Sequence, residues 1–165
     1  MIRASMGSED PRSRTLWPPL SGAAERAAYL CVVPLALGLT GVAALGGYPA
    51  RELAQRATIA WGAALLAFSG AVHWGLALGG RLPWRPASLG GALAPLPVAV
   101  LAVLGGGQRG LALLVVGFGG LWLYEHRVLG AALPPAYLAL RRALTIATCA
   151  LLALTMFVSD AAGLT

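Results

Sequence analysis

The chain alternates long apolar runs with short polar connections, and most of the runs are long enough to cross a membrane as helices. The clearest run covers residues 58–78 and contains no full charge. An α-helix rises about 1.5 Å per residue, so about 20 residues cross the hydrocarbon layer. Clusters of glycine, proline and arginine separate the runs. We therefore predict five transmembrane helices, at residues 27–45, 58–78, 87–104, 111–124 and 143–158.

Two of these predicted spans contain proline, and a third is short. Pro34 in the first span, and Pro95 and Pro97 in the third, lack a backbone donor, so we expect a kink or an interruption at each place. Residues 111–124 are marginal for a span, and we expect this helix to recruit the flanking glycines or to rely on its neighbours for shielding.

The polar residues near the fourth and fifth spans predict where these helices end. We expect Glu125, His126 and Arg127 to end the fourth span abruptly as a solvated helix end. Pro134-Pro135 then predicts a separate segment, residues 136–142, that lies at the membrane interface. In that segment Tyr137 would be the interfacial anchor, and Arg141 and Arg142 would extend their guanidinium groups to lipid phosphates.

Composition supports a single membrane unit. The chain of 165 residues is 58% hydrophobic and 11% charged, which is not typical of a soluble domain. Residues 1–26 are polar and irregular, and we predict a cytoplasmic tail there, followed by one five-helix domain over residues 27–160. The predicted fold class is therefore all-α, a polytopic membrane helix bundle.

The basic residues, all of them arginine, predict the orientation. Cytoplasmic connections carry the excess of arginine in membrane proteins, so the N-terminus is predicted to be cytoplasmic and the C-terminus outside. The location expected is the inner membrane of a bacterium, or the mitochondrial inner membrane in a eukaryote. Because the arginines are scattered among connections, the net charge of +6 indicates contact with the lipid bilayer and no nucleic acid. The cytoplasmic set is Arg3, Arg12, Arg14, Arg26, Arg81, Arg85, Arg127, Arg141 and Arg142, against Arg51, Arg56 and Arg109.

Two stretches resemble a known family. They are AWGAALLAFSGAVHWGLALGG at residues 60–80 and PPAYLALRRALT at residues 134–145. Together with the proline in the first span, they resemble the DUF3429 family of small membrane proteins, which includes the animal transmembrane protein 69. Ala136 departs from the family, which usually has tryptophan before the tyrosine. The resemblance implies an integral membrane protein of several spans; the family has no established activity, so no mechanism is implied.

His73 is the candidate for chemistry because it is an ionisable side chain inside an apolar run. It would lie about 7–8 Å inside the cytoplasmic end of the second span, where an ionisable group is a functional-site hypothesis by default. Ser69 lies one turn earlier on the same face. Trp74 adds an indole N–H, and His126 ends the fourth span on the same side. We take Ser69, His73, Trp74 and His126 as candidate ligand-binding residues.

Two interpretations of His73 remain open. In the first, His73 is a neutral side chain that is hydrogen-bonded to a carbonyl or a serine and locks the bundle. In the second, it binds a ligand, and a bis-histidine haem with His126 is the alternative to having no cofactor. We predict no metal site and no catalytic residues, because HExxH, a phosphate loop, paired carboxylates and a Ser/His/Asp set are missing. We also expect no charged residue in the middle of a span. Proton-coupled transport usually requires such a residue, so this function is not favoured.

Small residues predict where helices pack closely, and we assign Gly62, Gly70 and Gly75 to such contacts. The function expected is a structural or assembly partner that contacts other membrane protein subunits through small-residue faces, and an enzymatic role is not favoured. The alternative is a binder or carrier of a quinone or a porphyrin on the His73 and Trp74 face. A filled core around His73 would favour the first function, and an accessible polar pocket there the second.

Overall fold

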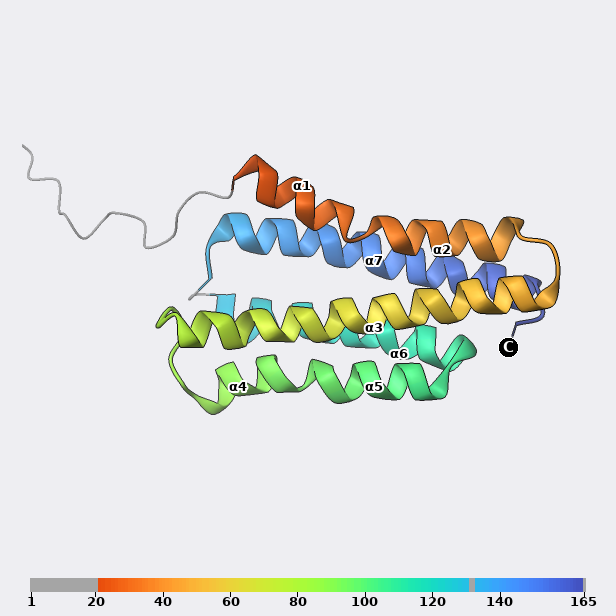
Figure 1. Ribbon diagram of the computed structural model, residues 1–165. Helices are drawn as coiled ribbons and strands as arrows, with labels where there is room; N and C mark the ends of the chain where they lie inside the picture. Colours follow the sequence, from red (N-terminus) through yellow and green to blue (C-terminus); the bar gives the residue numbers. More distant parts are fainter. Residues whose placement is uncertain (1–20, 131–132, 165) are drawn as a thin grey trace, which may run out of the picture.

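The computed structural model describes residues 21–130 and 133–164 and is a helical bundle (Figure 1). It is 86% helical and contains no strand among these residues, so the predicted all-α class is confirmed. Five helices are long and apolar enough to cross a membrane, as predicted: Gly22–Ala44, Tyr48–Leu78, Pro86–Gly105, Gly107–Leu129 and Pro135–Ala161. Residues 1–20 of the predicted tail lie outside the described residues.

The helices form a closed ring in which α2, α3, α5, α6 and α7 each pack on the next, and α7 returns to α2. In Figure 1, α2, α3 and α5 form one layer, and α6 and α7 lie behind it. α3 also contacts α6 across the ring, so the second and fourth spans are neighbours. The elements are α1 (Gly22–Leu30), α2 (Val33–Ala44), α3 (Tyr48–Leu78), α4 (Pro86–Leu93), α5 (Pro95–Gly105), α6 (Gly107–Tyr124), the π-helix η2 (Glu125–Leu129) and α7 (Pro135–Ala161).

Proline interrupts the first and third spans, as predicted. α1 ends just before Cys31, and Pro34 lies in the first turn of α2, where its missing N–H costs no helix bond. The carbonyl of Cys31 accepts a hydrogen bond of 2.9 Å from the indole Nε1 of Trp61. In the third span the break falls at Pro95, the first residue of α5. Pro97 lies within the first turn of that helix and makes no second break.

Three predicted helix boundaries are wrong. α1 begins at Gly22 because Ser21 caps it, its hydroxyl accepting from the amide of Ala24, so the tail ends before residue 26. α7 is one 27-residue helix from Pro135, so residues 136–142 form no separate interfacial segment. The fourth span does not end at Glu125, since η2 continues it for five residues. At its other end α6 includes Gly107, so this span does recruit a flanking glycine, as expected.

Glycines decide how closely α3 approaches its neighbours. A Cβ at Gly62 would lie 2.8 Å from Leu114 Cδ1 in α6. A Cβ at Gly70 would lie 2.6 Å from the carbonyl oxygen of Ala92 at the end of α4. Gly75 faces open space, and an added Cβ there would meet no atom of the described residues within 4 Å. The first two glycines therefore set helix–helix distances, and the third does not.

Candidate functional site

A buried carboxylate is the central feature of the site. Glu125 begins η2 and is fully buried, so the prediction that residues 125–127 form a solvated helix end is wrong for this residue. π-helical turns inside α-helices occur frequently at functional sites. η2 belongs to the membrane-spanning helix Gly107–Leu129, so Glu125 lies near the end of a span rather than in its middle, where no charged residue was expected.

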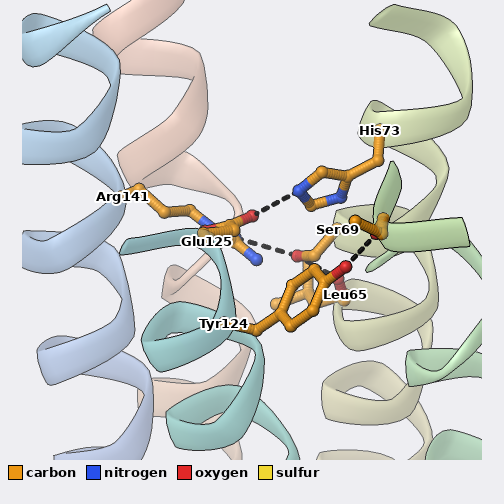
Figure 2. Close-up of polar contacts among 7 residues, drawn as sticks. Leu65, Ser69, His73, Tyr124, Glu125 and Arg141 are labelled. Atoms are coloured by element: carbon orange, nitrogen blue, oxygen red, sulfur yellow. Dashed lines mark hydrogen bonds and ion pairs between the residues drawn. The ribbon is translucent and has the colours of Figure 1, made fainter. Parts of the chain in front are cut away.

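Two helices, α7 and α3, place ionisable side chains next to this carboxylate (Figure 2). Arg141 of α7 donates from Nε to Glu125 Oε2 at 2.9 Å. Nε2 of His73 in α3 lies 3.3 Å from the other oxygen, Oε1. The side chains of His73 and Glu125 are fully enclosed, and only 12% of the Arg141 side chain is exposed. The prediction that Arg141 extends to lipid phosphates is therefore wrong, because its partner lies inside the bundle.

Ser69 joins the arginine to α3. Its hydroxyl accepts a hydrogen bond of 2.9 Å from Arg141 Nη1 and donates one of 2.7 Å to the carbonyl of Leu65, one turn earlier in its own helix. Arg141 thus holds α7 to α6 through Glu125 and to α3 through Ser69. We call Ser69, His73, Glu125 and Arg141 the polar network.

Two aromatic side chains and one glycine enclose the polar network. The hydroxyl of Tyr124 donates to the carbonyl of Ala87 in α4, which holds the ring in place. A Cβ at Gly91 would lie 2.8 Å from Tyr124 Cε1 and 3.5 Å from His73 Cδ2, so α4 lies directly against the imidazole. The phenol of Tyr137 in α7 lies beside Glu125. His73 is consequently 1% exposed.

Several polar atoms in the network have no hydrogen-bond partner. They are both ring nitrogens of His73, Oε1 of Glu125 and Nη2 of Arg141. Nε2 of His73 and Oε1 of Glu125 lie 3.3 Å apart, but the geometry of this contact does not meet the criteria for a hydrogen bond. Unpaired polar atoms are costly in a buried site, so these atoms mark where the network has capacity for another bond.

The structure brings together two of the four candidate ligand-binding residues. Ser69 and His73 belong to the polar network. Trp74 points outward and packs edge-on against Trp84, with ring centroids 5.4 Å apart. His126 is exposed and stacks on Trp122 at 5.6 Å. His73 and Trp74 therefore share no face, and His126 does not join His73.

No metal site is evident in the described part of the chain, where no three His, Cys, Asp or Glu side chains gather. A haem held by His73 and His126 does not fit this arrangement, because one imidazole faces Glu125 inside the bundle and the other is exposed.

Sequence reasoning missed Glu125 and Arg141, although one signal pointed to them. In the two connections predicted to be cytoplasmic, residues 79–86 and 125–142, Glu125 is the single acid among five arginines. A lone acid beside a short span with arginines following it is a candidate for a buried pair. Glu125 lies inside the bundle only because the fourth helix continues past Tyr124, and the apolar run of residues 111–124 does not indicate that continuation.

Comparison with known proteins gives one match. The family model described as "Protein of unknown function (DUF3429)" matches residues 22–157. No curated protein and no solved structure matches the chain, so the expected similarity to transmembrane protein 69 is not confirmed.

Proposed function

The chain belongs to the DUF3429 family, a family of unknown function, and we propose that it is an assembly or interaction partner of another membrane protein complex. The observation that carries this proposal is the filled core around His73. The imidazole is fully enclosed and is surrounded by groups of the same chain. A side chain enclosed in this way contributes to packing within the chain and is not accessible to a ligand from outside.

In this proposal the polar network is a lock for the bundle. Charges buried in a membrane are tolerated when they are paired, and one arginine and one carboxylate sum to zero when His73 is neutral. The network joins α3, α6 and α7, which are far apart in sequence. It therefore specifies the order of helices around the ring, which apolar contacts in lipid specify weakly.

A groove on the outside offers a surface for the partner. It measures about 410 Å³ and lies between α4, α5 and α6, with an apolar lining that includes Gly90, Ala94, Val98, Gly117 and Gly120. Small residues let a second helix approach closely in a membrane. Gly91 and Tyr124 lie at the groove and also against His73, so the groove adjoins the lock without exposing it.

The proposal is tested by native mass spectrometry of the gently extracted protein. We expect a second membrane protein at fixed stoichiometry, and we expect Gly120→Leu to remove it without changing thermal stability, because Gly120 faces open space. Gly75→Leu is the matched control, since it also faces open space but lies on α3. A monomer without a partner in every preparation would refute the assembly role, and a visible absorption band would support the quinone or porphyrin alternative.

Replacing His73 tests its structural role. We expect His73→Leu to lower the free energy of unfolding by about 1–3 kcal/mol, because Glu125 loses a polar neighbour in an enclosed site. His73→Gln retains a hydrogen-bond donor and should be much closer to the wild type. Thermal unfolding of all three proteins in one detergent provides the comparison. Equal stability of the Leu and Gln variants would contradict the lock.

Orientation is a separate proposal, supported by the nine-to-three distribution of arginine. We expect the N-terminus in the cytoplasm and a multi-pass location in the bacterial inner membrane, or the mitochondrial one in a eukaryote. Reporters fused at residues 82 and 130 should then behave as cytoplasmic, and one fused after residue 165 as external. A cytoplasmic signal from the C-terminal fusion would reverse the orientation.

A further inference from the structure

We propose that His73 and Glu125 form a proton-binding site inside the membrane domain, with one proton held between Nε2 of His73 and Oε1 of Glu125. This inference goes beyond the assembly role and depends only on the geometry of the polar network. The two atoms lie 3.3 Å apart, and neither has another hydrogen-bond partner.

The distance itself requires a proton. A neutral imidazole nitrogen without hydrogen is an acceptor, and so is a carboxylate oxygen. Two acceptors facing each other at 3.3 Å in an enclosed site repel, so one of the two atoms carries hydrogen. Arg141 donates from Nε to the other carboxylate oxygen, Oε2, and we assign the hydrogen of the close contact to Nε2 of His73, with Oε1 as its acceptor.

The titratable and polar groups that face the imidazole come from three other elements and from α3 itself. Glu125 from η2 faces it directly, and Arg141 from α7 binds the same carboxylate. Tyr137 of α7 lies beside Glu125, and Tyr124 of α6 and the imidazole of His73 both lie against Gly91. Ser69, one turn away in α3, accepts from Arg141. With neutral His73 these groups carry no net charge.

A second proton links the site to movement of the helices. It would come from water and bind Nδ1 of His73, a buried imidazole that lies beside the backbone of Ser69 and Gly70. No bond between heavy atoms forms or breaks, and the network gains one positive charge. Since an unbalanced charge is costly in a membrane interior, uptake favours separation of α3 from α6 and α7, or entry of water between them. Proton binding thus weakens the contacts that the polar network makes between α3, η2 and α7.

Nitrogen-15 NMR of histidine-labelled protein in detergent tests the proposal. The chain has two histidines, and His126→Gln leaves the signal of His73 alone. His126 is exposed and outside the network, so this background should keep the fold. At neutral pH we expect hydrogen on Nε2 and a bare Nδ1. Acidification should convert this species to one imidazolium.

Glu125→Gln in the same background removes the charge that holds the proton. We expect the proton affinity of His73 to fall about tenfold or more, because an opposite charge in contact is lost. Glu52→Gln is the matched control, since Glu52 pairs with the exposed Arg56 elsewhere in α3. Equal titration of both variants would overturn the proposal. A wild-type imidazole with hydrogen on Nδ1 alone would also overturn it, and this result does not depend on whether Glu125→Gln folds.

Discussion

Glu125→Ala is expected to lower the free energy of unfolding by about 3–5 kcal/mol, the range for breaking a buried ion pair by removing one partner. The substitution leaves the guanidinium of Arg141 largely buried, with Ser69 as its remaining acceptor in the network. The polar network contains no second carboxylate that could replace the lost partner. The measurement is reversible unfolding in mixed micelles, with wild type and variant in the same lipid.

Glu52→Ala is the control for this effect. Glu52 forms an ion pair of 2.6 Å with Arg56, whose side chain is 71% exposed, so its loss should cost no more than about 1 kcal/mol. A second comparison adds Arg141→Met to Glu125→Ala. Removing both charges should recover much of the stability, because the uncompensated charge disappears. Similar losses for Glu125→Ala and Glu52→Ala would mean that Glu125 is accessible to water.

Gly70→Leu is expected to destabilise the bundle by about 3 kcal/mol, the upper end of the range for overpacking. The added Cβ alone would lie 2.6 Å from the carbonyl oxygen of Ala92 and 3.0 Å from Cγ of Pro95. Both atoms belong to the junction of α4 and α5. A backbone carbonyl and a proline ring cannot relieve the contact by changing rotamer, as a flexible side chain could. α4 would have to move away from α3.

Gly75→Leu separates this contact from the general effect of leucine in α3. Gly75 lies in the same helix but faces open space, so we expect a change within about 0.5 kcal/mol. Thermal unfolding of the two variants in one detergent gives the difference directly. If Gly75→Leu proved as costly as Gly70→Leu, the close approach of α4 would not be the cause.

The membrane bundle was predictable because its signals are local. The length of each apolar run predicts a span, and Pro34 and Pro95 predict the two interruptions. The polar network was not predictable in the same way. Arg141 meets Glu125 across 16 residues and Ser69 across 72, and no local period records such pairs. Arginine and glutamate at a helix end look the same in sequence whether they face water or each other.

Which face a side chain occupies was equally hard to predict. His73 and Trp74 are consecutive, so a helix turns them about 100° apart, and only the packing of α4 shows which one is inside. His126 follows Glu125 in the same way and faces outward. The candidate site grouped His73 with Trp74 because they are adjacent in sequence, although the helix places their side chains on different faces.

The position of Glu125 within the chain has a consequence for biosynthesis. The acid leaves the ribosome before Arg141, so α6 and η2 are complete while their counter-ion is still being made. This span is also the least hydrophobic of the five, and a buried carboxylate without its partner makes insertion of the span by itself less favourable. We therefore expect α6 and α7 to enter the bilayer together as a helical hairpin. A chain truncated before Arg141 should leave its fourth span outside the membrane, where an added protease would cleave it.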